Sequence, residues 1–211
     1  MAYPVNITVQ PALKDRNRLT TFFRFFLAIP HIILVGGAAF GLGSGMSGGG
    51  RLSFGTEGGL LGAVAVFLAI VSWFTIVITG THITGIRQFT LFFMRWRVRA
   101  VAYLMLFSDA YPPFGDESYP ASIDIVDPAV PRDRLTVGFR IILAIPHFIV
   151  LAFVMFGWCI TTIVAWFVIV FTGDYPQGLW DFGVGTLRWL LRVQAYMLLL
   201  VDEYPPFSLD A

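Results

Sequence analysis

An internal repeat constrains the fold of this 211-residue chain more than any other feature. The motif LAIPH occurs at Leu27–His31 and again at Leu143–His147. The motif YPPF occurs at Tyr111–Phe114 and again at Tyr204–Phe207. Because two separated motifs recur in the same order, the chain is predicted to contain two copies of one structural unit.

Each copy is predicted to form one membrane domain, with boundaries at residues 1–114 and 115–211. The first copy is longer, and a glycine-rich insertion at about residues 41–59 accounts for the difference. Each copy opens with a segment of alternating polar and apolar residues, YPVNITVQP or YPASIDIVDP. Alternation of this kind is typical of a half-buried strand, so we expect a short strand at the start of each copy.

The composition is that of a membrane protein. Hydrophobic residues make up 57% of the chain and charged residues 13%, whereas soluble domains carry about 25% charged residues. The apolar runs at about 21–40 and 60–79 each have the roughly 20 residues needed to cross a hydrocarbon core of about 30 Å. The uncharged run 141–173 is predicted to form two shorter crossings with a turn near Gly157-Trp158. The expected fold is therefore an all-α integral membrane bundle of four transmembrane helices, arranged as two hairpin repeats.

The distribution of basic residues predicts the orientation in the membrane. If each copy is a hairpin, both termini and the middle of the chain share one side, and of the Lys and Arg residues only Arg51 lies opposite. The positive-inside rule makes the basic side cytoplasmic. Copies with an even number of crossings point the same way, which predicts a pseudo-twofold axis along the membrane normal. A net charge of +1 argues against a nucleic-acid partner.

Two amphipathic segments, residues 87–107 and 179–201, carry arginines near their middles. Arginine in a crossing helix costs at least about 2.5 kcal/mol, so we predict that both segments are interfacial helices on the cytoplasmic surface. They would either anchor the protein at the interface or bind anionic lipid headgroups at about 1 kcal/mol per arginine. The predicted interfacial residues are Arg95, Trp96, Arg99, Arg188, Trp189 and Arg192.

The LAIPH motif places a proline and a histidine inside each apolar run, at Pro30-His31 and at Pro146-His147. A proline frees the carbonyl four residues earlier, so one interpretation is a kinked helix with an internally bonded histidine. A second is that His31 and His147 face each other across the axis and bind one haem iron or metal ion. A third is a proton relay or gate, because ionisable groups within membranes are functional candidates.

Read in order, the blocks RNRLTTFFRFFLAIPH, WF, TG, RW and YPPF resemble the bacterial membrane family catalogued as domain of unknown function 4389 (DUF4389), in two tandem copies. The resemblance covers both copies apart from the glycine-rich insertion. The first copy departs from the pattern at Thr81–Ile83, where the second has Asp174–Pro176. The family implies a multi-pass protein of the bacterial cytoplasmic (inner) membrane with both termini cytoplasmic, and it supplies no activity.

No catalytic set of residues is visible, and no acidic residue lies inside an apolar run. We therefore expect a non-enzymatic accessory, scaffold or assembly subunit of a larger bacterial membrane complex. Its partners would be other membrane subunits and anionic lipids, with no resident cofactor or metal. One alternative is a haem- or metal-binding redox subunit that uses His31 and His147. Another is a small transporter or channel along the repeat axis.

Overall fold

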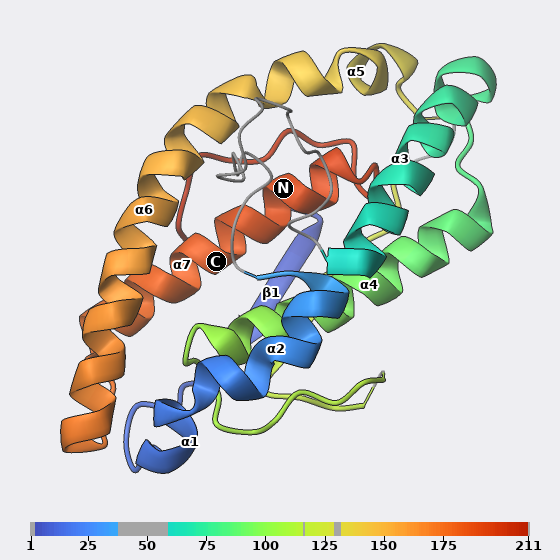
Figure 1. Ribbon diagram of the computed structural model, residues 1–211. Helices are drawn as coiled ribbons and strands as arrows, with labels where there is room; N and C mark the ends of the chain where they lie inside the picture. Colours follow the sequence, from blue (N-terminus) through green and yellow to red (C-terminus); the bar gives the residue numbers. More distant parts are fainter. Residues whose placement is uncertain (1–2, 38–58, 116, 129–131, 211) are drawn as a thin grey trace, which may run out of the picture.

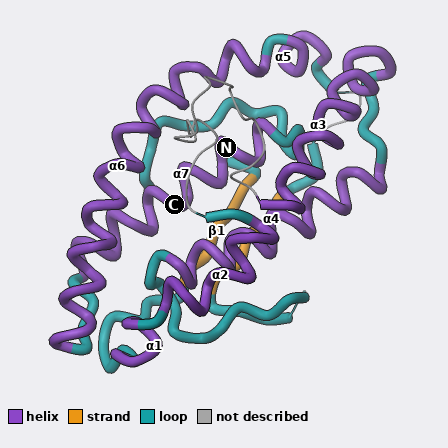
Figure 2. The backbone as a smooth tube through the Cα atoms, viewed as in Figure 1, coloured by secondary structure: helices purple, strands orange, loops and turns teal. Residues whose placement is uncertain are grey.

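The computed structural model describes residues 3–37, 59–115, 117–128 and 132–210, so most of the glycine-rich insertion lies outside the described residues (Figure 1). Helices dominate these residues, and two short strands accompany them (Figure 2). In chain order the elements are β1 (Val5–Val9), α1 (Arg18–Phe22), α2 (Arg24–Val35), α3 (Gly59–Thr79), α4 (Thr84–Leu104), β2 (Ala121–Ile125), α5 (Arg134–Gly138), α6 (Arg140–Thr172) and α7 (Gln177–Met197).

The strands expected at the start of each copy are present and pair with each other. β1 and β2 form an antiparallel two-stranded sheet in which Val5 lies opposite Ile125 and Val9 opposite Ala121. Alternate residues of β1 are buried, as the sequence alternation predicts. The sheet therefore joins the first copy to the second at the level of the backbone.

The second apolar run forms one continuous helix, α6, and the prediction of a hairpin with a turn near Gly157-Trp158 was wrong. Trp158 is 1% exposed and packs within the helix layer beneath it. Every residue between Pro146 and Gly173 has a backbone N–H, and none has a positive φ. The helix therefore continues as far as Gly173. Gly173 has φ 84° and donates its N–H to Ile169 O, which is a common glycine helix ending.

In the first copy, α2 and α3 together occupy the place that α6 occupies in the second copy. α2 ends at Gly36, and α3 begins at Gly59 beside that end. A Cβ on Gly59 would lie 2.5 Å from the carbonyl carbon of Leu34, so the two helix ends are in contact. α2 has 12 residues, which is too short to cross a bilayer. Among the described residues, only α3 and α6 are long and apolar enough to do so, and four transmembrane helices are not confirmed.

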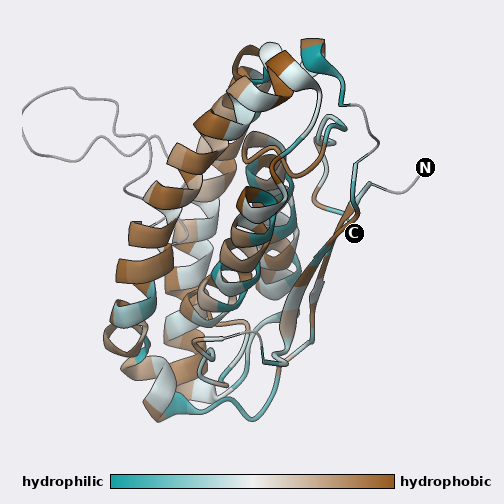
Figure 3. Ribbon diagram, turned by 90° about the vertical axis from the view of Figure 1, so that its right-hand side faces the viewer, coloured by the Kyte–Doolittle hydropathy of each residue, from teal (hydrophilic) through white to brown (hydrophobic). Residues whose placement is uncertain are grey.

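The helices and the sheet form three layers, which Figure 3 shows from the side. The apolar helices α2, α3 and α6 form an outer layer, α4 and α7 form the central layer, and the sheet lies on the opposite side of the central layer. α4 and α7 contribute more buried residues to the core than any other elements. Each of these two helices is covered by apolar helices on one side and by a strand on the other, and their predicted place at the cytoplasmic membrane surface stays a prediction.

The two copies also pack against each other head to tail. α1 contacts the end of α6, and α5 contacts the end of α3. The same kinds of hydrogen bond are made at both places. They join Arg16 N to Gly173 O (2.8 Å), Arg132 N to Gly80 O (3.0 Å), Trp166 Nε1 to Thr21 O (3.0 Å) and Trp73 Nε1 to Val137 O (2.9 Å).

Candidate functional site

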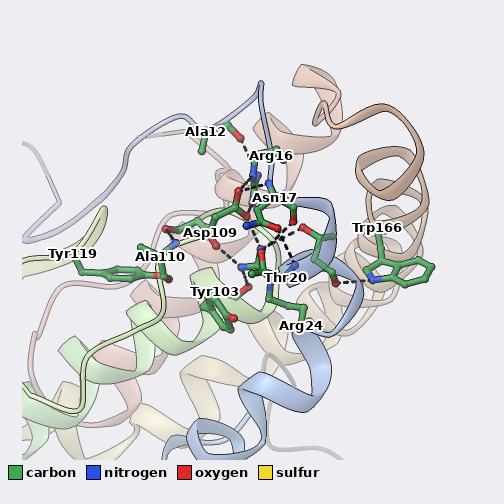
Figure 4. Close-up of polar contacts among 12 residues, drawn as sticks. Ala12, Arg16, Asn17, Thr20, Arg24, Tyr103, Asp109, Ala110, Tyr119 and Trp166 are labelled. Carbon is green, nitrogen blue, oxygen red and sulfur yellow. Dashed lines mark hydrogen bonds and ion pairs between the residues drawn. The ribbon is translucent and has the colours of Figure 1, made fainter.

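Two buried groups of charged residues, one in each copy, are the most polar features of the interior. In the first, Asp109 accepts two hydrogen bonds from Arg16, with Nε–Oδ2 at 3.0 Å and Nη2–Oδ1 at 2.7 Å (Figure 4). Arg24 donates a third bond from Nη2 to Oδ1 at 2.6 Å, and the backbone N–H of Asn17 donates a fourth at 3.0 Å. We refer to Arg16, Arg24 and Asp109 as the Asp109 cluster.

The second copy builds the same arrangement, which we call the Asp202 cluster. Arg132 donates from Nε and Nη2 to the two oxygens of Asp202, both at 2.5 Å. Arg140 donates from Nη2 to Asp202 Oδ1 at 2.8 Å. Both arginines are at most 4% exposed. Buried guanidinium groups are stable only when they are paired, and the shared carboxylate supplies that pairing.

One arginine of each cluster also ties two helices together. Arg24 is the first residue of α2, and its guanidinium lies 4.2 Å from the ring centre of Tyr103 near the end of α4. It donates from Nη1 to the carbonyls of Tyr103 (3.2 Å) and Ser108. Arg140, the first residue of α6, lies 4.3 Å from the ring centre of Tyr196 and donates to its carbonyl at 2.6 Å. Because carbonyls at a helix end attract a cation, these contacts fasten each apolar helix to an amphipathic one.

The Asp109 carboxylate is held in its ionised form. Burial by itself would raise the pKa of Asp109, but the hydrogen bonds from Arg16 and from the Asn17 amide, together with the charge of Arg16, outweigh burial and lower this pKa to about 2. A carboxylate with so low a pKa stays ionised near neutral pH. The cluster is therefore suited to holding structure and not to acid–base chemistry.

The repeated histidines contact the other repeated motif, YPPF, within their own copies. His31 Nδ1 accepts a hydrogen bond from Trp96 Nε1 at 3.1 Å, and its ring stacks on Phe114 with centroids 4.6 Å apart. Tyr111 lies against the same ring at 5.0 Å. We refer to such an enclosed imidazole as a histidine box.

The second histidine box repeats these contacts more closely. His147 Nδ1 accepts from Trp189 Nε1 at 3.2 Å, and the ring stacks on Phe207 with centroids 3.9 Å apart. Tyr204 lies at 4.8 Å. Both imidazoles are at most 1% exposed. Each ring is thus enclosed by aromatic residues of its own copy, and these contacts do not bring the two histidines together.

The six residues predicted to lie at the membrane interface fall into different environments. Trp96 and Trp189 are buried, and their indole N–H groups donate to the histidines of the two boxes. Arg99 and Arg192 are buried and donate to the carbonyls of Gly115 and Asp210, near the ends of the two copies. Arg95 is exposed and Arg188 is partly exposed, so the two keep access to the surrounding medium.

Arg97, the remaining arginine in the middle of α4, connects the copies. Its Nε donates to Gln194 Oε1 of α7 at 3.0 Å, and its Nη1 donates to the carbonyl of Val35 at the end of α2. The central layer therefore uses arginine to satisfy helix ends and to join α4 to α7. Helix-end carbonyls buried without such donors would be costly.

The sequence interpretation did not identify Arg16, Arg24, Arg132 and Arg140 as parts of a site. A signal was present, since these arginines and both aspartates recur at equivalent places in the two copies. Their pairing could not be read from the chain, because Arg24 and Asp109 meet only after α2 folds back on the end of α4.

No group of three or more His, Cys, Asp or Glu side chains able to hold a metal ion occurs among the described residues. A groove of about 420 Å³ lies between α2, α6 and the end of α4. Its lining is apolar apart from Arg24 and Thr162 and includes no carboxylate or imidazole. The groove therefore offers no acid–base pair for catalysis.

The chain matches a model of a known protein family. The family model described as a domain of unknown function (DUF4389) matches residues 52–115 and 134–208, which is one segment in each copy. No curated protein and no solved structure matches the chain. The family match covers the YPPF motif of both copies and the LAIPH motif of the second.

Proposed function

The chain belongs to the DUF4389 family, which is described only as a domain of unknown function, and we propose from its geometry that it is a non-enzymatic accessory, scaffold or assembly subunit of a membrane complex. Two of its helices are long and apolar enough to cross a membrane, and this supports a membrane location. The proposed role requires a rigid interior and a large outer surface that is free to contact lipid or other subunits.

The observation that carries this proposal is that the groups capable of chemistry are used to fasten helices. Asp109 and Asp202 each hold two buried arginines. His31 and His147 each accept an indole N–H and stack on a phenylalanine. These contacts give the side chains a structural use. They do not favour the haem-binding or transport alternatives, both of which need an accessible imidazole.

The proposed scaffold has pseudo-twofold symmetry between its two copies. The matched clusters, the matched histidine boxes and the reciprocal contacts of α1 with α6 and of α5 with α3 support this relation. Head-to-tail packing makes each copy complete the other. A unit locked in this way presents a fixed surface to partners, which suits assembly better than a reaction cycle does.

The experiment is purification of the tagged chain from its native membrane in a mild detergent, after brief chemical cross-linking. We expect other membrane proteins in fixed stoichiometry, and we expect the purified components to reassemble when mixed. The matched control is the Asp202→Ala variant, which is expected to destabilise the fold and to recover fewer partners. A monodisperse, folded monomer that recovers no stoichiometric partner would overturn the scaffold role.

An absorption spectrum of the same sample tests the redox alternative independently. We expect no Soret band from the purified chain, because both imidazoles are enclosed by aromatic rings. A stoichiometric Soret band that disappears in the His31→Ala and His147→Ala variants would replace the scaffold proposal with the redox one.

A further inference from the structure

The outer layer exposes apolar side chains along its entire length. On α6 the exposed fractions are 61% for Ile141, 75% for Phe153 and 74% for Phe171. On α2 and α3 they are 67% for Phe26 and 69% for Ile78. α2 and α3 pack against each other and α6 lies in the same outer layer, so the outward faces of all three helices point to one side of the molecule (Figure 3). Apolar patches of this extent are found where a protein meets another protein or a membrane.

The opposite side of the molecule is polar. The sheet buries Val5, Ile7 and Val9 against the core and turns Asn6, Thr8, Gln10, Ser122 and Asp124 outward. Among the described residues no third strand pairs with the sheet, so each strand keeps one open edge. An open sheet edge and an exposed carboxylate are not tolerated in hydrocarbon. The sheet side therefore belongs in water.

The length of the apolar surface does not fit a simple crossing. From Ile141 to Phe171 the exposed residues extend over about 45 Å, at about 1.5 Å per residue. The hydrocarbon core is about 30 Å thick, so a straight α6 with all these residues inside it would tilt by nearly 50°, whereas transmembrane helices tilt by at most about 40°. A crossing of α6 would also draw the sheet behind it into the hydrocarbon.

We propose that the chain lies in the plane of the membrane, with the layer of α2, α3 and α6 embedded in one leaflet and the sheet facing water. This inference rests on the membrane location used above and does not depend on the scaffold role. An embedded depth of about 5–10 Å is typical of helices that lie in the interface. In this orientation the tilt limit does not apply and the polar sheet stays hydrated.

The exposed basic residues fit this orientation. Arg18 in α1 and Arg134 in α5 are exposed, and each precedes an exposed leucine, Leu19 or Leu135. These pairs occupy equivalent places at the two ends of the outer layer. In the plane of the membrane, both arginines reach anionic headgroups of the same leaflet. In a crossing orientation they would lie on opposite sides of the bilayer.

Depth measurements by spin labelling test the proposal in vesicles that contain anionic lipid. Cys159 is exposed in the middle of α6 and can carry a label in the native chain. In a Cys159→Ala background, labels at Ile145→Cys, Phe153→Cys and Phe167→Cys extend the profile along the exposed face. We expect equal, shallow depths at these positions. A profile that is deepest near residue 159 and shallow at both ends would overturn the proposal.

The sheet provides the matched control for depth. Labels at Thr8→Cys and Ser122→Cys should collide freely with a water-soluble relaxation agent and not with oxygen dissolved in the bilayer. Protection of the sheet labels from the aqueous agent, in the purified chain without partners, would contradict the proposed orientation.

Sidedness gives a second, independent measurement. Arg18→Cys and Arg134→Cys, each in the Cys159→Ala background, are equivalent positions at opposite ends of the layer. A membrane-impermeant maleimide should modify both from the same side of sealed vesicles. Modification from opposite sides would establish a crossing and overturn the proposal. Loss of partners in the purification experiment with an unchanged depth profile would remove the scaffold role alone.

Discussion

The two copies of the repeat differ most in the outer layer, where the first has two helices and the second has one. α2 ends at Gly36 and α3 begins at Gly59, whereas α6 runs unbroken from Arg140 to Thr172. Both versions make the same kinds of contact with the amphipathic helix of their own copy and with the other copy. The repeated unit is therefore defined by its buried polar contacts and not by the continuity of its apolar helix.

The two aspartate clusters allow the most direct comparison of the copies. Substitutions there are expected to have the largest effects on the unfolding free energy. Asp109→Ala or Asp202→Ala leaves two buried guanidinium groups without their carboxylate, which costs about 3–5 kcal/mol of unfolding free energy. Chemical unfolding in detergent, followed by tryptophan fluorescence, measures this loss. We expect losses of similar size in the two variants, because the paired arginines are equally buried.

Lys14→Ala, at an exposed position before α1, is the control for these variants and should change the unfolding free energy by less than about 0.5 kcal/mol. A loss below about 1 kcal/mol in either aspartate variant would show that the clusters do not hold the helices together.

Substitutions in the histidine boxes are expected to have the next largest effects on the unfolding free energy. His31→Ala and His147→Ala each remove a buried ring and the acceptor of an indole N–H, with a cost of about 2–3 kcal/mol. The loss should be larger for His147, whose ring lies 3.9 Å from that of Phe207, than for His31, at 4.6 Å from Phe114. Unfolding curves for the two variants in the same detergent decide the order, and equal losses would show that the closer stacking has no energetic effect.

Acid should weaken the first copy through Asp109. Because the folded-state pKa of about 2 lies below the ordinary aspartate value of 3.8, the contribution of Asp109 to stability is fully present above pH 4 and is lost as pH falls through 2. This difference in pKa corresponds to about 2 kcal/mol of unfolding free energy. Unfolding free energies measured between pH 6 and pH 2 test this expectation, with Asp109→Asn as the comparison variant. An identical acid slope in wild type and Asp109→Asn would show that Asp109 does not contribute.

The smallest effects on stability are expected from substitutions at the glycines that follow the apolar helices. Gly80 follows α3 with φ 76°, and Gly173 follows α6 with φ 84°. Alanine at either position costs about 1–2 kcal/mol, because an L-residue disfavours the left-handed region. Gly173→Ala should cost more, since its Cβ would lie 3.2 Å from Arg18 Nε. Thermal unfolding of both variants measures the difference, and a stabilised Gly173→Ala would contradict it.

Much of the architecture could be predicted from the chain. The repeat of LAIPH and YPPF predicts two copies of one unit, and the alternation in YPVNITVQP predicts a strand, because both signals are local. The turn near Gly157-Trp158 was inferred only from the length needed for two crossings. It is absent because a glycine inside an apolar run does not end a helix unless other residues support a turn there.

The environment of the arginines and histidines required the tertiary structure. The family, the repeat and the unusually apolar composition follow from the chain alone, because they depend on residue identity and order. The burial of α4 and α7, and the pairing of Asp109 and Asp202 with two arginines each, are evident only in three dimensions. The physical reason is that a buried charge is stable only beside its partner, and those partners lie far apart along the chain.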